Sequence, residues 1–250
     1  MNYRILVVLG LLVASCQQAP KKATVTAQSI VDKAIENSGG EAYKNSKVQF
    51  TFRGIQYEAE NKNNSRVLKR ITKTDSLTIT DIKSGNDFMR YFDDRAIVLA
   101  DSMAARYANS VNSVHYFSRL PYGLNDAAVK KELVGEVQIK TNDYYKVKVT
   151  FEENNGGDDF EDVFLYWFNK ETHHPDFLAY EYHTDGGGIR FREAFNERRI
   201  GGIRFADYRN YKPKKGTTVD FMMIEALFES DSLELLSTIE LQDIRVATQD

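Results

Sequence analysis

DFEDVFLYWFNKETHHPDFLAYEYHTDGGGIRFREAFNERRIGGIRFADYRNY, residues 159–211, is the stretch of this chain that decides its fold. It is rich in aromatic side chains and contains Trp167, the only tryptophan. The glycine groups 186–188 and 201–202 divide it into short runs of aromatic and β-branched residues, which are typical of strands. The stretch therefore predicts four consecutive antiparallel strands that form the wall of a core or a cavity.

Segments on both sides of this stretch extend the same pattern. Residues 48–52 and 145–151 alternate apolar and polar side chains, as half-buried strands do, and bulges are expected near Gly54 and Gln242. Helical spacing is confined mainly to one segment after Thr26 and another that starts at Asp101. The predicted fold class is therefore mainly β (α+β): a curled antiparallel sheet or half-open β-barrel, covered by an N-terminal helix and a middle helix.

The N-terminus reads as an export signal. Arg4 precedes an apolar run, residues 5–13, which is too short to cross a hydrocarbon core of roughly 30 Å as a helix. Val-Ala-Ser-Cys at 13–16 resembles the lipobox of bacterial lipoproteins, and Cys16 is the only cysteine. We predict a signal peptide over 1–15, lipidation of Cys16 as a membrane anchor, a tether over 16–26 and one domain over 27–250. The alternative is an ordinary cleaved signal peptide in which Cys16 is simply a buried cysteine.

The composition and the absence of known catalytic motifs argue against several classes of function. A formal net charge of −3 and the lack of a basic face argue against a nucleic-acid partner. With 42% hydrophobic and 28% charged residues, the chain resembles a folded globular protein. No nucleophile elbow, zinc-protease motif, phosphate loop or cysteine nucleophile is present, so the sequence predicts no cofactor and favours a non-catalytic role.

Charged residues within the aromatic stretch have two interpretations. Arginines crowd its last strands (Arg190, Arg192, Arg198, Arg199, Arg204 and Arg209), either as a site for an anionic headgroup or carboxylate or as a cross-strand ladder of ion pairs on a solvated face. The apolar parity of residues 189–195 predicts that Ile189, Phe191 and Phe195 face the interior, with Arg190 and Arg192 opposite. Glu193 and Glu197 share the apolar side and need cations, for which Arg204 and Arg209 are the candidates. The candidate ligand-binding residues are Trp167, Tyr180, Tyr182, Phe191, Glu193, Phe195, Phe205, Arg204 and Arg209, although such an aromatic set is more often a core.

Weaker patterns suggest other chemistry. Acidic residues 158, 159, 161 and 162 could bind a hard cation, but their spacing matches no calcium-binding loop and favours a solvated turn at the start of a strand. His173 and His174 could help to bind a metal, yet the following proline favours a hairpin turn. A hydrolase would require Asp162, His183 or Asp185 to converge in one cleft.

Three quoted segments carry a family resemblance: DVFLYWFNKETH at 162–173, YHTDGGGIRFREAFN at 182–196 and IGGIRFADYRNY at 200–211. Together with the lipobox, they resemble an uncharacterised family of Gram-negative envelope lipoproteins. The predicted architecture also resembles the lipoprotein carriers LolA and LolB, in which helices cover a curled sheet around an apolar cavity. This resemblance implies a lipoprotein of the outer membrane, facing the periplasm, that binds a lipid or acyl chain; a structural or assembly protein with a filled core is the alternative.

Overall fold

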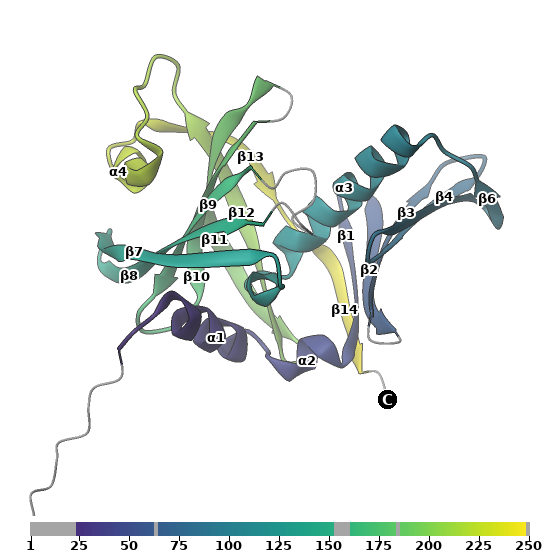
Figure 1. Cartoon of the computed structure of the whole chain (residues 1–250), viewed down its shortest axis with the longest axis horizontal. Coiled ribbons are helices and arrows are strands. Elements are labelled where there is room, and N and C mark those ends of the chain that lie inside the picture. Colours follow the sequence, from purple (N-terminus) through teal and green to yellow (C-terminus); the bar gives the residue numbers. More distant parts are fainter. Residues whose placement is uncertain (1–23, 63–64, 153–160, 184–185, 249–250) are drawn as a thin grey trace, which may run out of the picture.

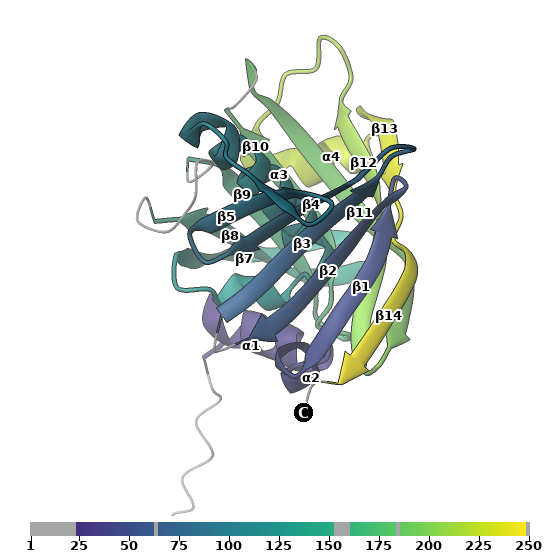
Figure 2. The same cartoon turned by 90° about the vertical axis from the view of Figure 1, so that its right-hand side faces the viewer.

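The computed structural model describes residues 24–62, 65–152, 161–183 and 186–248, which form two antiparallel seven-stranded sheets. The first sheet has, in spatial order, β14 (Gln242–Thr248), β1 (Ser46–Phe52), β2 (Ile55–Lys62), β3 (Ser65–Lys73), β4 (Thr78–Ser84), β5 (Asp87–Phe92) and β6 (Arg95–Ile97). The second sheet has β13 (Leu233–Ile239), β12 (Ile203–Pro213), β11 (Gly188–Ile200), β10 (Pro175–Tyr182), β9 (Val163–Asn169), β8 (Asn142–Phe151) and β7 (Val129–Ile139). Both sheets are curled and neither closes on itself (Figures 1 and 2). The predicted fold class is confirmed, and β9 to β12 are the four consecutive strands expected from residues 159–211.

Few helices accompany the sheets in the described part of the chain. They are α1 (Ala27–Asn37), α2 (Glu41–Lys44), α3 (Asp101–Ser118), the 3-10 turns η1 (Tyr122–Asn125) and η3 (Phe221–Met223), and α4 (Ile224–Glu229). Thr26 and Ser29 form a reciprocal capping box at the start of α1. α1 lies along one end of the second sheet, whereas α3 runs from the outer strands of the first sheet toward the second (Figure 1). Both predicted helices are therefore present and cover the sheets.

The chain passes from one sheet to the other between β13 and β14. The backbone N–H of Leu241 donates to Asp207 Oδ1 at 3.0 Å, and Arg198 donates to the same oxygen at 3.0 Å. Arg198 also donates to the Leu241 carbonyl at 2.6 Å. The pairing of β14 with β1 shifts register at Gln242, so the bulge predicted there is confirmed. The buried Asp207 carboxylate thus holds the junction of the two sheets together.

The bulge predicted at Gly54 is wrong. Phe52 pairs directly with Ile55, so Arg53 and Gly54 form a two-residue hairpin turn. Their φ angles of 51° and 75° are those of a turn whose twist matches the flanking strands. The change of apolar parity at this point therefore marks the start of a new strand.

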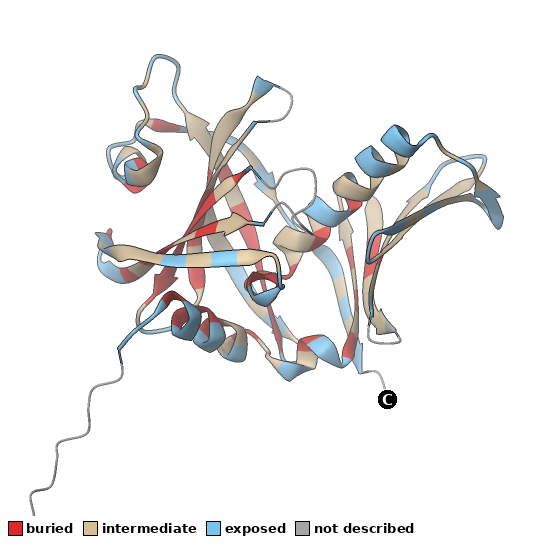
Figure 3. Ribbon diagram, viewed as in Figure 1, coloured by how far each residue is buried: buried red, intermediate tan, exposed pale blue. Residues whose placement is uncertain are grey.

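Many residues of the second sheet are buried (Figure 3), and their side chains belong to two clusters on opposite faces of the sheet. One face carries Tyr166, Phe168 and Leu178 and packs against α1 and α3. The opposite face carries Trp167, Phe191 and Phe177 and is covered by residues 221–228. Residues of the β9 to β12 wall are therefore apolar on both parities because both sides are covered, and large aromatic side chains supply much of the buried area.

Candidate functional site

A cavity of about 440 Å³ lies between the second sheet and α3. Its wall includes side chains from β9 to β12 and the inward side of α3, while residues from the bend between β13 and β14 line its edge. The aromatic lining residues are Phe52, Tyr116, Phe117, Phe151, Phe164, Tyr180, Tyr182 and Tyr208. Pockets that bind small molecules span roughly 300–1,000 Å³, so the interior of this fold has room for a ligand.

The aromatic wall is uncharged. The ring of Phe164 stacks on Tyr180 with centroids 5.3 Å apart, and Tyr116 meets Phe164 edge-on at 5.9 Å. The hydroxyl groups of Tyr116 and Tyr166 share a hydrogen bond of 2.7 Å. Burial raises the pKa of both phenols, so they stay neutral at neutral pH. This wall suits an apolar chain.

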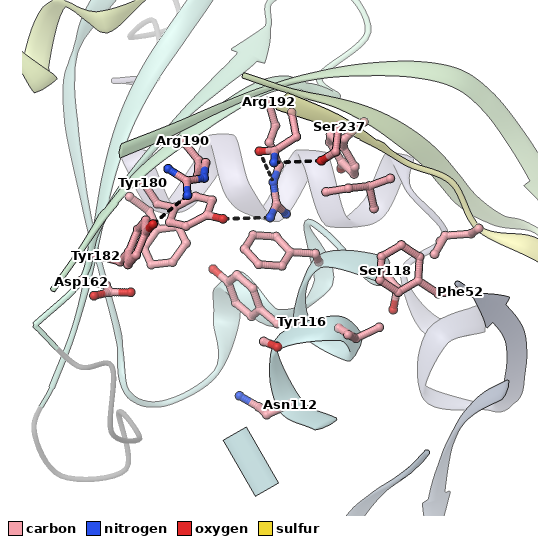
Figure 4. A pocket seen from close by; sticks show the side chains of 18 of the residues that line it. Phe52, Asn112, Tyr116, Ser118, Asp162, Tyr180, Tyr182, Arg190, Arg192 and Ser237 are labelled. Carbon is pink, nitrogen blue, oxygen red and sulfur yellow. Dashed lines mark hydrogen bonds between the residues drawn. The ribbon is translucent and has the colours of Figure 1, made fainter. Parts of the chain in front are cut away.

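Two arginines enter the cavity from β11, as Figure 4 shows. Arg190 donates from Nη2 to the Tyr182 hydroxyl at 2.7 Å, and Arg192 donates from Nη2 to the Tyr180 hydroxyl at 2.9 Å. The sequence predicts these arginines on the side opposite the interior, and that prediction is wrong. Strand alternation does separate them from Phe191, but the cavity lies on the arginine side and Phe191 packs under α4.

The structure distributes the aromatic candidate ligand-binding residues over three places. Tyr180 and Tyr182 line the cavity. Trp167 and Phe191 lie on the opposite face, where the Phe191 ring stacks on Phe228 at 4.8 Å. Phe205 packs where the two sheets meet. A ligand-binding role for any of these residues stays a prediction.

The inward glutamates have the cations expected for them. Glu193 Oε2 lies 3.3 Å from Arg209 Nη1, and its other oxygen lies 2.8 Å from Lys140 Nζ. The Arg209 guanidinium also lies over the Phe195 ring, 4.5 Å from its centroid. These groups lie on the face away from the cavity. They form a cross-strand ion-pair group, as the second interpretation of the charges predicted.

Glu197 pairs with Arg204 across β11 and β12. Glu197 Oε2 lies 2.7 Å from Arg204 Nε and 3.1 Å from His174 Nδ1. Burial lowers the pKa of His174 from its ordinary value. The register of β11 against β12 shifts between Phe195 and Arg198, which changes the parity that the sequence assigns to Glu197.

The other predicted chemistry is only partly within the described residues. Asp162 lies at the cavity wall with its Oδ1 3.9 Å from His183 Nδ1, whereas Asp185, Asp158 and Asp159 lie outside the described residues. Across the part of the chain that the structure describes, no group of three or more His, Cys, Asp or Glu side chains could hold a metal ion. Sequence reasoning missed Tyr208 and Asn210 as cavity residues, whereas Arg190 and Arg192 belong to the arginine group that the first interpretation made an anion site.

The model of a family of unknown function, DUF6503, matches residues 4–241, nearly the whole chain. The chain belongs to this family. Its fold is similar to that of a LolA superfamily protein from Nitrosomonas europaea, with 16% identity, coverage of 91% of this chain and 95% of that one, and a TM-score of 0.51. A putative outer membrane lipoprotein-sorting protein domain from Vibrio parahaemolyticus matches with 8% identity, 89% and 92% coverage and a TM-score of 0.46.

A DUF1329 family protein from Desulfovibrio piger matches with 12% identity, coverage of 89% of this chain and 93% of that one, and a TM-score of 0.42. No curated protein matches the chain.

None of the helices in the described ranges has the length and apolar character needed to cross a membrane. The expected LolA-like fold is confirmed.

Proposed function

We propose that this chain is an envelope lipoprotein that binds a lipid or acyl chain in the cavity between the second sheet and α3. The observation that carries the proposal is the cavity of about 440 Å³, whose lining includes eight aromatic side chains. Burial of apolar surface contributes about 25 cal/mol per Å², so an alkyl chain placed there would be favoured strongly over water. The fold shared with a LolA superfamily protein supports this proposal by analogy.

Ligand binding is tested by filling the cavity. Ala206 lines it, and Ala206→Phe would place a ring in its interior. Ala105→Phe is the matched control because Ala105 is exposed on α3. In titrations with a fluorescent fatty acid, we expect Ala206→Phe to weaken binding at least about tenfold, equivalent to about 1.4 kcal/mol, while Ala105→Phe behaves as wild type.

A structural or assembly protein with a filled core is the alternative function. It predicts that no lipid co-purifies with the chain and that fatty-acid titrations show no saturation. Native mass spectrometry of the protein carrying Cys16→Ser, which removes the expected acylation site, checks the first point. Those two negative results together would contradict the lipid-binding proposal.

The location of the protein follows from its N-terminal residues in this proposal. Residues 1–15 are the signal peptide, Cys16 carries the lipid and residues 16–26 tether one domain, 27–250, to the outer membrane on its periplasmic side. Two acyl signals suffice for stable anchoring. Radiolabelled palmitate should be incorporated into wild type and not into Cys16→Ser, which should also move from the membrane to the soluble fraction. Labelling of the Cys16→Ser variant would refute the anchor.

A further inference from the structure

Cations that are buried in this fold are paired with carboxylates, with one exception. Four Lys or Arg residues are buried among the described residues. Lys146 pairs with Glu225 at 2.7 Å, Arg204 with Glu197 at 2.7 Å and Arg119 with Asp126 at 3.4 Å. Arg192 is 7% exposed and has no described carboxylate within 4.0 Å. An unpaired buried charge is costly, and Arg192 is the one of these four cations that has no carboxylate partner among the described residues.

Neutral groups surround the Arg192 guanidinium. Its Nη2 donates to the Tyr180 hydroxyl at 2.9 Å, and its Nε makes a long contact of 3.4 Å with Asn210 Oδ1. The ring of Phe117 covers one face, 3.8 Å from the guanidinium carbon. Nη1 has no hydrogen-bond partner among the described residues. Burial lowers the pKa of Arg192 from its ordinary value.

The surrounding charges favour an anion at this place. Arg190 points into the same cavity two residues along β11 (Figure 4), and no described carboxylate lies within 4.0 Å of it. Asp162 is the one carboxylate that lines the described cavity, and the imidazole of His183 lies 3.9 Å from it. The guanidiniums of Arg190 and Arg192 lie on one face of the strand and repel each other, and an anion near both would offset that repulsion.

We propose that the cavity takes an anionic single-chain amphiphile, whose carboxylate or phosphate oxygen binds the Arg192 guanidinium while its alkyl chain lies against Phe164, Phe151 and Tyr116. Guanidinium groups match the oxygen geometry of both headgroups. The hydroxyl of Tyr180 and the amide of Asn210 orient the guanidinium for this contact. A volume of about 440 Å³ lies in the lower part of the range for ligand pockets, which favours one chain over two. This inference rests on the proposed function and names its ligand class.

The experiment compares three probes whose hydrocarbon tails all derive from oleic acid: oleate, oleoyl lysophosphatidate and oleyl alcohol. Each competes with a fluorescent fatty acid on the wild-type chain below its aggregation concentration. A hydrogen bond to a charged group implies that at least one anion binds about 10- to 100-fold tighter than the alcohol. The tighter of the two anions identifies the headgroup as carboxylate or phosphate.

Variants then assign the preference to one side chain. Arg192→Met should lose the preference for the anion and keep its affinity for oleyl alcohol, while Arg192→Lys keeps part of the preference because it keeps the charge. Arg245→Met is the matched control, since Arg245 is exposed on β14. The wild-type comparison stands even if Arg192→Met does not fold.

The outcomes separate the two proposals. Equal affinity of the wild type for all three probes overturns the headgroup inference and leaves lipid binding intact. A preference that survives in folded Arg192→Met also overturns it. Failure of every probe to bind overturns the inference together with the proposed function.

Discussion

A buried ion pair fastens α4 to the second sheet, and its removal should destabilise the fold strongly. Lys146 Nζ on β8 lies 2.7 Å and 2.8 Å from the two carboxylate oxygens of Glu225 on α4, with side chains only 4% and 6% exposed. The ammonium also donates to the carbonyl of Met222. Lys146→Met removes the cation and leaves the Glu225 carboxylate buried without a counter-charge.

The size of the effect follows from the loss of one partner only. Breaking a buried pair in this way costs about 3–5 kcal/mol of unfolding free energy. For a chain of this length, each kcal/mol lowers the Tm by roughly 2–4 °C, so the Tm should fall by about 6–20 °C. The double variant Lys146→Met/Glu225→Leu leaves no unpaired charge and should lie within about 2 kcal/mol of wild type, because apolar replacements of a whole buried pair are often neutral.

Urea unfolding of the two single variants and the double variant measures this coupling. Trp167 reports on α4, since its fully buried ring packs beneath the helix with Lys146 Nζ 5.3 Å from the ring centroid. A fluorescence change that precedes the loss of circular dichroism would show that α4 detaches first. Lys33→Met is the control, because Lys33 and Glu36 form an exposed pair, and exposed pairs contribute little to stability. The reasoning is refuted if Lys146→Met costs no more than Lys33→Met or if the double variant shows the sum of both single losses.

Two further predictions concern charges of the first sheet and α3. Asp81 accepts hydrogen bonds from both Arg70 and Arg90, so Asp81→Asn should cost about 3–5 kcal/mol in urea unfolding; a cost equal to that of the exposed Asp87→Asn would contradict this. Burial lowers the pKa of His115 to about 4, so the folded state favours the neutral ring and loses up to about 3 kcal/mol of stability as the pH falls from 6.5 to 4. In His115→Gln that part of the pH dependence should disappear. If the unfolding free energy of this variant depends on pH as in wild type, His115 is not the group responsible.

Local patterns in the sequence were enough to predict the four strands and the two main helices. Glycines separate β10, β11 and β12 from one another, and the Thr26 cap precedes a one-sided apolar stripe, so each signal acts within one element. The pairing of Glu193 with Arg209 was predictable for the same reason, because the two residues lie opposite each other on neighbouring antiparallel strands.

Features that depend on distant parts of the chain were not predictable. Residues 219–228 are apolar on both parities and carry no clear helical signal, yet they form η3 and α4 because that segment covers the face bearing Trp167. The turn at Arg53 and Gly54 was also not predictable. A bulge and a two-residue turn both shift the apolar side chains to the opposite parity, and only the pairing of Phe52 with Ile55 shows that this is a turn.

The sequence could not locate the cavity, because its position depends on the helices that cover the two faces of the second sheet. An arginine that alternates with apolar residues normally indicates a solvated face, but α4 buries one side of β11 and α3 closes the other over a cavity. Arg204 and Arg192 are both buried on neighbouring strands, and only Arg204 meets a carboxylate, Glu197. A register shift in β11 brings Glu197 to Arg204. Arg192 instead contacts the Tyr180 hydroxyl and lines the cavity. The presence or absence of a carboxylate partner in the folded protein therefore distinguishes Arg204, which is structural, from Arg192, which is available to a ligand. No local sequence pattern encodes this difference.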